Sequence, residues 1–368
     1  MAQTSDIIIV GGGAIGAACA RDLAARGHQV QIIEAGTDMG QAWRAAAGML
    51  APQIEADGDD PLLAFGLRAR DYYDSLARDL RETTGVDLGL WREGIARVAM
   101  DEADAERLRR KVSWQLEHGY PCEWIEGEEL RRRWPWMGPA VGALWASQDG
   151  ALDPERLVLA LLTDAERLGA AVVRDRVTAL DIVGGRVAGV TGERGHYAAS
   201  NVVIAAGAWS IQIHGMPRPL PVQPVRGQMA ALPWPSGMPR AILYHNDSYL
   251  LARGDEAILG STMEYVGFRP EVTSAGLAQV FSSTMALCPG LVRSKVRRTW
   301  AGLRPVTPDG IPIIGEEPEL PGLWYATGHG RNGILLAGLT GRVVAQLLSQ
   351  EPTDVAVHSF TPERFNTL

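Results

Sequence analysis

The sequence predicts an α/β fold, in which a Rossmann-like domain on a parallel sheet is interleaved with an α+β domain on an antiparallel sheet. Two apolar, β-branched runs predict the parallel sheet: 6–10 near the start of the chain and 201–209 far along it, both running into small residues. Alternating runs such as 94–100 and 241–251 predict antiparallel strands in the stretches between and after them.

The first parallel strand leads into the glycine turn Gly11-Gly12-Gly13-Ala14-Ile15-Gly16. A helix is expected over 17–26, and a second strand over 29–33 ends at Glu34, eighteen residues after Gly16. This order of strand, glycine turn, helix, strand and acid is the dinucleotide-binding fingerprint, and the helix N-terminus offers its unpaired N–H groups to the phosphates. A purely structural turn is the alternative interpretation.

The glycines and the acid of this fingerprint each have a physical role. Gly11 permits the tight turn, Gly13 lets a pyrophosphate approach the backbone, and Gly16 lets helix and strand pack closely. Glu34 can accept hydrogen bonds from a ribose diol and would repel a 2′-phosphate, so FAD or NAD is favoured over NADP.

Length and composition narrow the class of protein. A chain of 368 residues exceeds one typical domain, and 46% hydrophobic with 21% charged residues is typical of a globular protein. The net charge of -8 argues against nucleic acid or an anionic membrane surface as a partner. Since no apolar run reaches about 18 residues, no membrane span is expected.

The metal-binding residue types are scattered. Cys19, Cys122 and Cys288 are odd in number and form no CxxC pair, so we expect free thiols in a reducing compartment, with the cytoplasm as the default location. The seven histidines form no ligand-spaced cluster, so no metal site is expected.

The remaining elements follow from capping residues, periodicity and glycine breaks. We expect helices over 61–84, 101–118, 126–134, 154–168, 274–287 and 334–348, a hairpin within 171–190, and strands over 257–263 and 323–327. The predicted division assigns 1–86, 142–215 and 300–368 to the dinucleotide-binding domain and 87–141 and 216–299 to the substrate domain.

Five further motifs, taken together with the fingerprint, resemble the D-amino-acid oxidase family of flavoproteins, most closely its glycine oxidase (ThiO-type) branch. They are Ala45-Ala46-Ala47-Gly48-Met49-Leu50, Val225-Arg226-Gly227-Gln228, Gly260-Ser261-Thr262-Met263-Glu264, Trp300-Ala301-Gly302-Leu303-Arg304-Pro305 and Gly328-His329-Gly330-Arg331-Asn332-Gly333-Ile334-Leu335. The resemblance covers nearly the whole chain and implies a FAD-binding domain of the glutathione-reductase type.

The resemblance also implies that FAD is bound non-covalently along the fingerprint, the Ala-rich segment, the second parallel strand and the C-terminal glycine turn. The residues expected to contact it are Gly11, Gly13, Ala14, Ile15, Gly16, Glu34, Ala35, Ala42, Trp43, Ala47, Gly48, Met49, Val177, Ala206, Gly207, Trp209, His329, Gly330, Arg331, Asn332, Gly333, Ile334 and Leu335.

For the substrate, the resemblance implies that Arg304 and Tyr249 hold a carboxylate and that Arg331 lies close to substrate and flavin. Arginine's planar fork can grip a carboxylate bidentately, and a tyrosine hydroxyl adds a donor. Met49 and Met263 are expected to wall a small pocket. A surface ion pair for Arg304, and ordinary packing for Tyr249 and the two methionines, are the alternatives.

The expected reaction is FAD-dependent oxidative deamination of glycine, sarcosine and short D-amino acids. A hydride passes from the substrate α-carbon to the flavin, dioxygen reoxidises the flavin to give hydrogen peroxide, and the imine hydrolyses to oxo acid and ammonia. The resemblance also suggests a supply to thiamine thiazole biosynthesis. The sequence does not decide whether the protein forms a homo-oligomer.

Four alternatives remain at this stage. Two are enzymes of the same class, a sarcosine or N-methyl-amino-acid oxidase and a quinone-linked D-amino-acid dehydrogenase. The third is a flavin-binding tRNA-modification module, which the acidic charge disfavours, and the fourth is a non-enzymatic flavin-binding assembly factor, which Arg304 and Arg331 disfavour. The chain departs from the family pattern at Trp43-Arg44, where relatives tend to carry a small hydroxyl residue. It also has Leu251-Ala252-Arg253 where relatives often have Val-Pro-Arg after the pocket tyrosine.

Overall fold

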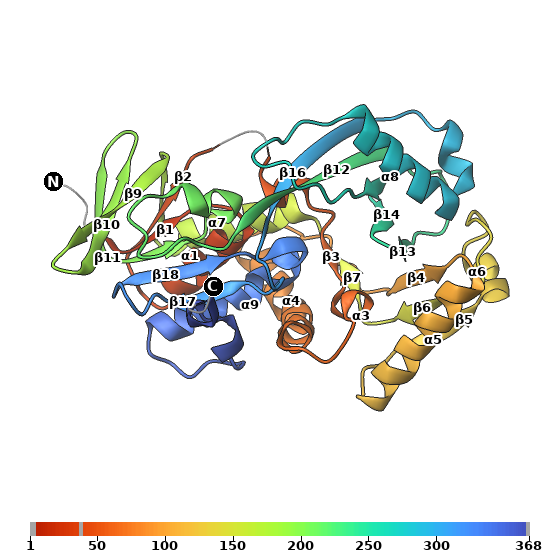
Figure 1. Cartoon of the computed structure of the whole chain (residues 1–368), viewed down its shortest axis with the longest axis horizontal. Coiled ribbons are helices and arrows are strands. Elements are labelled where there is room, and N and C mark those ends of the chain that lie inside the picture. The colour runs from red at the N-terminus through yellow and green to blue at the C-terminus, as the bar shows by residue number, and fades with distance from the viewer. Residues whose placement is uncertain (1–4, 37–39, 366–368) are drawn as a thin grey trace.

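The computed structural model describes residues 5–36 and 40–365, in which two large sheets of eight strands each are present. In Figure 1 the parallel sheet with its helices occupies one half of the molecule, and the antiparallel sheet occupies the other. Strands β12 and β16 run from one half toward the other. The predicted α/β fold with an antiparallel second sheet is confirmed.

The first sheet has the order β17-β18-β11-β1-β2-β8, with a hairpin added at β11. Its strands are β1 (Ser5–Val10), β2 (Val30–Glu34), β8 (Ala171–Arg174), β9 (Val177–Val183), β10 (Arg186–Gly192), β11 (His196–Ile204), β17 (Ile313–Glu316) and β18 (Leu323–Thr327). β1 pairs in parallel with both β11 and β2, as the two apolar runs predict. Their carboxyl ends therefore meet at one edge of the sheet, where ligands of such sheets bind.

Helices cover this sheet. They are α1 (Ala14–Ala24), α4 (Pro61–Thr84), α7 (Pro154–Arg167) and α9 (Gly333–Leu348). α1 packs against α9 and α7, and α4 packs against α9. The predicted bounds of α4 agree with the structure, because its ends are marked locally: Asp60 caps it, Pro61 occupies its first position, and Gly85 ends it with φ +75°.

The second sheet has the order β16-β12-β15-β14-β13-β4-β6-β5. Its strands are β4 (Ile95–Ala99), β5 (Glu123–Glu126), β6 (Gly142–Ala146), β12 (Gln223–Pro233), β13 (Ile242–His245), β14 (Ser248–Arg253), β15 (Glu256–Gly260) and β16 (Arg298–Val306). The helices α5 (Glu102–Glu117), α6 (Gly127–Arg133) and α8 (Ser274–Leu287) pack on it.

Four elements are short: α2 (Ala42–Ala45), α3 (Pro52–Glu55) and the strand pair β3 (Met49–Leu50) and β7 (Gly150–Ala151). Figure 1 shows α3, β3 and β7 between the two sheets. The Ala-rich segment thus begins as one helical turn and continues as extended chain. Among the helices in the described ranges, none is both long and apolar enough to cross a membrane.

Three details differ from the sequence-based expectations. α1 begins at Ala14 rather than at residue 17, because the helix already starts inside the glycine turn. The run 241–251 is divided into β13 and β14 by a tight turn, in which Asn246 adopts φ +49°. β6 and β16 pair within the antiparallel sheet, although 142–146 and 300–306 fall in the predicted dinucleotide-binding domain. The division into domains stays a prediction.

Candidate active site

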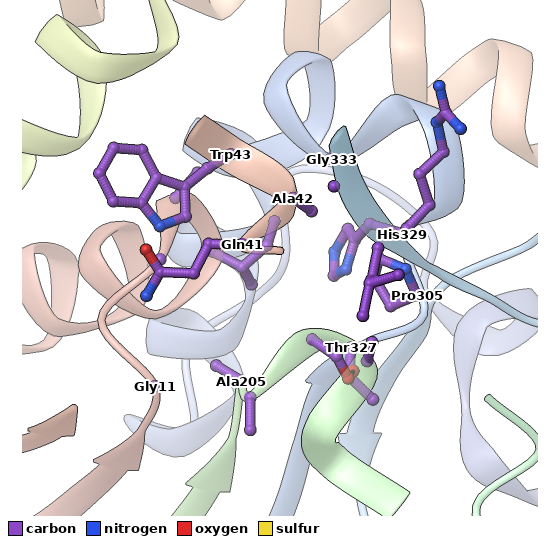
Figure 2. Close-up of a pocket in the computed structure, with 18 of the residues that line it drawn as sticks. Gly11, Gln41, Ala42, Trp43, Ala205, Pro305, Thr327, His329 and Gly333 are labelled. Atoms are coloured by element: carbon purple, nitrogen blue, oxygen red, sulfur yellow. Dashed lines mark hydrogen bonds between the residues drawn. The ribbon is translucent and has the colours of Figure 1, made fainter. Parts of the chain in front are cut away.

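A cavity of about 380 Å³ lies at the carboxyl edge of the parallel sheet and extends toward the antiparallel sheet. The glycine turn, the Ala-rich segment, the ends of β11 and β18, and β16 all border it. Figure 2 shows Gln41 and Trp43 on one side of it and His329 and Pro305 on the other, with Ala205 and Thr327 at its floor. It therefore joins the fingerprint to the residues predicted to bind a substrate.

The glycine turn has the tight geometry that the fingerprint predicts. Gly11 has φ +104°, and a Cβ on it would lie 2.6 Å from the carbonyl oxygen of Ala205. A Cβ on Gly16 would overlap the carbonyl oxygen of Gly11. Only glycine fits both positions, since side chains would clash with backbone and rarely adopt a φ near +100°.

Glu34 lies beside this turn and borders the cavity. Its carboxylate accepts hydrogen bonds from the Gly12 amide at 2.6 Å, the Gly36 amide at 2.8 Å and the Gln41 side chain at 3.1 Å. These bonds fix the carboxylate at the end of β2, where an acid of this fingerprint meets a ribose. Gln41 was not predicted, because no sequence pattern links it to Glu34.

Most of the residues expected to contact FAD border the cavity. They are Gly11, Gly13, Ala14, Ile15, Glu34, Ala35, Ala42, Trp43, Ala47, Gly48, Met49, Val177, Ala206, Gly207, Trp209, His329, Gly330, Arg331, Asn332, Gly333 and Ile334. Gly16 and Leu335 do not border it. Gly16 packs α1 against the turn, and Leu335 is buried in the hydrophobic core. Both residues therefore support the packing of the fold and do not line the cavity.

Trp43, one of the departures from the family pattern, stands next to the glycine turn. A Cβ on Gly13 would lie 3.1 Å from Trp43 Cδ1, so indole and turn are in close contact. The guanidinium of Arg44 stacks on the indole at 4.3 Å from the ring centroid. The indole borders the cavity with a flat apolar wall where a small hydroxyl residue would offer a hydrogen bond.

His329 carries a buried polar atom without a protein partner. Its Nε2 lies 3.1 Å from the Thr340 hydroxyl, whereas its Nδ1 has no hydrogen-bond partner among the described residues. Burial lowers the pKa of His329 to about 3, so the ring is neutral near pH 7. A buried polar atom at the cavity wall fits a ligand that supplies the missing hydrogen bond.

Arg304 reaches the cavity from β16. Its Nη2 donates to the Ser261 hydroxyl at 2.6 Å and its Nη1 to the Thr262 carbonyl at 3.1 Å. No carboxylate of the described residues lies within ion-pairing distance of it. Burial lowers the pKa of Arg304 below its ordinary value, because the enclosed cation has lost solvation. The guanidinium is thus an uncompensated charge at the cavity wall.

Two glycines make room for the predicted substrate residues. A Cβ on Gly227 would overlap the guanidinium of Arg304, and a Cβ on Gly260 would lie 2.7 Å from the hydroxyl of Tyr249. Both glycines belong to motifs that carry the family resemblance. These motifs are therefore needed to seat side chains that reach the cavity from neighbouring strands.

Tyr249 is buried on β14 and borders the cavity. Its hydroxyl lies 3.0 Å from the sulfur of Met229. Burial raises the pKa of Tyr249, so the hydroxyl stays protonated and remains a donor. A thioether is a weak acceptor, which leaves this donor free to bind a better one.

Arg331 also borders the cavity, but it is paired. Its Nη2 lies 3.6 Å from Glu55 Oε1 and its Nη1 lies 3.1 Å from Asp247 Oδ1. Its Nη2 also donates to the Tyr244 hydroxyl. The nearby Glu55 carboxylate raises the pKa of Arg331, so the guanidinium is a firmly charged, compensated cation. None of these three partners was predicted, since they lie far from Arg331 in the sequence and belong to no motif.

The two predicted pocket methionines are placed differently. Met49 borders the cavity, as predicted. Met263 lies outside the cavity lining and the residue is 37% exposed, although its sulfur is 3.6 Å from Arg304 Nη1. The bond between Arg304 and Thr262 holds this segment so that Met263 contacts the guanidinium from the outside.

Comparisons with known proteins agree with this site. The model of the FAD dependent oxidoreductase family (DAO) matches residues 6–347. Glycine oxidase from Geobacillus kaustophilus is 36% identical over 98% of each chain. A bifunctional protein ThiO/ThiG from a Nostoc species is 34% identical over 97% of this chain and 55% of its own length.

The fold agrees as well. The crystal structure of glycine oxidase from Geobacillus kaustophilus superposes with a TM-score of 0.93, at 33% identity over 97% of this chain and 98% of that chain. The family match and these relatives span nearly the whole sequence, as the motif-based resemblance predicts. The chain therefore belongs to the DAO family and is an FAD-dependent oxidoreductase.

Proposed function

We propose that this enzyme is an amino-acid oxidase that deaminates glycine and other small amines such as sarcosine and short D-amino acids. The single observation that carries the proposal is Arg304: a cation at the cavity wall, hydrogen-bonded to neutral groups and paired with no described carboxylate. Such a charge is costly unless a ligand compensates it, and a carboxylate matches its planar fork. The names of the glycine oxidase relatives point to the same substrate class.

The residues around the cavity would position both cofactor and substrate. The glycine turn and Glu34 would hold the phosphates and ribose of FAD, and His329 would offer it Nδ1. The N-terminus of α9, at Gly333, borders the cavity, and its dipole favours negative charge there. Bound FAD supplies a two-electron acceptor for the hydride of the substrate α-carbon.

The protein's part in the chemistry is orientation. Arg304 would fix the substrate carboxylate, and Tyr249 would add a hydrogen bond from its neutral hydroxyl. Loss of two electrons and two protons converts an amine to an imine, which water hydrolyses to oxo acid and ammonia, or to oxo acid and methylamine when the substrate is sarcosine. Dioxygen takes up the electrons and protons as hydrogen peroxide. No side chain has to act as a general base if the substrate amine enters uncharged.

The walls favour a small substrate. Met49 and Tyr249 are bulky side chains that border the same cavity as Arg304. Glycine places no side chain against them, whereas a longer D-amino acid has to fit its side chain into occupied space. The relative named ThiO/ThiG supports a proposed role in supplying thiamine thiazole biosynthesis. The cytoplasm is the proposed location of the enzyme.

Turnover of a substrate panel tests this proposal. Purified holoenzyme is assayed with glycine, sarcosine, D-alanine, D-proline and D-phenylalanine, while peroxide, ammonia and oxygen uptake are measured together. We expect glycine and sarcosine at the top, with one peroxide formed per oxygen consumed. Turnover with a quinone but without oxygen uptake would instead identify an amino-acid dehydrogenase. Absence of turnover on every amine would refute the proposal.

A further inference from the structure

The two arginines that border the cavity differ in their charge balance. Among the described residues, Arg304 contacts neutral groups only: the Ser261 hydroxyl, the Thr262 carbonyl and the Met263 sulfur. Arg331 lies within 3.6 Å of the Glu55 carboxylate and 3.1 Å of the Asp247 carboxylate. Only one of the two guanidinium groups is therefore available to an incoming anion without displacing a carboxylate.

The position of Glu55 is fixed by hydrogen bonds to the backbone of its short helix, α3. The backbone amides of Gln53 and Ile54 donate to Asp149 Oδ2 at 3.2 Å and 3.1 Å. Arg97 and Lys111 both donate to the carbonyl oxygen of Ile54 at 2.9 Å. Asp149 is itself buried and paired with Arg70 at 2.9 Å. The chain thus holds Glu55 in place by contacts independent of Arg331.

Glu55 and Asp247 do not contribute equally. The Glu55 side chain is 19% exposed and borders the cavity, whereas the Asp247 side chain is 77% exposed. Charge pairs are screened by water at exposed positions and much less at enclosed ones. Glu55 is therefore the main compensating charge, and its influence is the largest contribution to the raised pKa of Arg331.

We propose that Glu55 is a specificity-determining residue: by compensating Arg331, it restricts the site to amines that carry a single carboxylate. A second carboxylate on the substrate would meet Glu55 at Arg331 and be repelled, while the first remains on Arg304. Removal of the Glu55 charge converts Arg331 into a second anion site and admits dicarboxylic amines. The inference rests on the proposed function, because Arg304 must hold the first carboxylate.

Binding of unreactive analogues to the holoenzyme tests this directly. Glycolate carries one carboxylate, whereas diglycolate carries two, one on either side of an ether oxygen. Calorimetry gives the dissociation constant of each, and the ratio of the two constants measures how well the site binds a second carboxylate. We expect Glu55→Gln to improve diglycolate relative to glycolate by about tenfold, since charge complementarity at an enclosed pair is worth that much. The kcat/KM ratio of iminodiacetate to glycine should shift in the same direction.

Three variants separate the outcomes. Asp247→Asn, at the exposed carboxylate, should shift the ratio only about threefold. Glu106→Gln, on the far exposed face of α5, makes the same change in net charge and should leave the ratio unchanged. Arg304→Ala should abolish glycolate binding in every background.

Each result has one meaning. A ratio in Glu55→Gln equal to that of the unaltered protein, with flavin content and Tm retained, overturns the inference. An equal shift in Glu106→Gln overturns it too, because the effect would then follow net charge alone. If Glu55→Gln loses its flavin, an unchanged ratio in Asp247→Asn overturns it. Retained glycolate binding in Arg304→Ala refutes the proposed function instead, since the first carboxylate would be held elsewhere.

Discussion

Replacement of Arg304 tests whether this residue serves substrate binding rather than the stability of the fold. Nη1 and Nη2 each carry two N–H groups, and each uses one of them for Thr262 or Ser261. With the Nε–H, three donors are left, and two of them can bind a carboxylate side by side. Charge-assisted hydrogen bonds contribute about 1.5 kcal/mol or more each, so Arg304→Met should cost about 3 kcal/mol of substrate binding, a factor of about 150 in kcat/KM.

The same substitution should not unfold the protein. Burial lowers the pKa of Arg304, which means that folding disfavours its charge. Methionine fills similar space without that charge, so the Tm of Arg304→Met should equal or exceed that of the unaltered protein. Steady-state kinetics and thermal unfolding of the holoenzyme measure both quantities. Arg298→Met, at an exposed arginine on the same strand, is the matched control.

Two results would refute this reasoning. An unchanged kcat/KM would show that Arg304 does not hold the carboxylate. A large fall in Tm would show that the guanidinium is a structural element rather than a charge kept for a ligand. Arg304→Lys offers an intermediate test: it keeps the charge but loses the planar fork, and should recover only part of the affinity.

Three other predictions follow from the site and the core. Denaturation should release intact FAD into the supernatant of the yellow protein; flavin that stays with the precipitated chain would contradict non-covalent binding. Met263→Ala should change the order of D-amino-acid substrates only slightly, because Met263 lies outside the cavity lining, whereas Met49→Ala should favour larger ones. Burial raises the pKa of Asp22 to about 6, so its contribution to stability falls as pH rises from about 4 to about 6. Asp22→Asn should gain about 3 kcal/mol relative to the unaltered protein across that interval in denaturant titrations, and parallel pH profiles would contradict the shift.

Local signals explain why much of the fold could be predicted. α8 begins at Ser274 as predicted, because Thr273 caps it and its side chain accepts from the Gly276 amide. The fingerprint predicted the parallel pairing of β1 with β2, since the spacing of strand, turn and helix admits few arrangements. In such cases the residues that decide the structure are close together in the sequence.

The rest of the site depends on contacts between distant segments. Arg331 was predicted to lie close to substrate and flavin, but its charge partners Glu55 and Asp247 come from distant parts of the chain and were not predicted. Likewise, the turn at Asn246 has no glycine or proline to mark it. A single acid such as Glu55 carries no motif, and only the packing of α3 brings it to the cavity.

The strand order imposes a condition on how this protein is synthesised. β1 is synthesised long before its partner β11, which begins at His196. The strand on the other side of β11 is β18, which begins only at Leu323. At typical translation rates of about 5–20 residues per second, the apolar strand Ser5–Val10 waits on the order of ten seconds or more for that partner. During this time one edge of β1 has unpaired N–H and C=O groups, and such an edge is a template for aggregation. The nascent chain therefore depends on β2 and α1 to cover β1 until the ribosome has delivered β11.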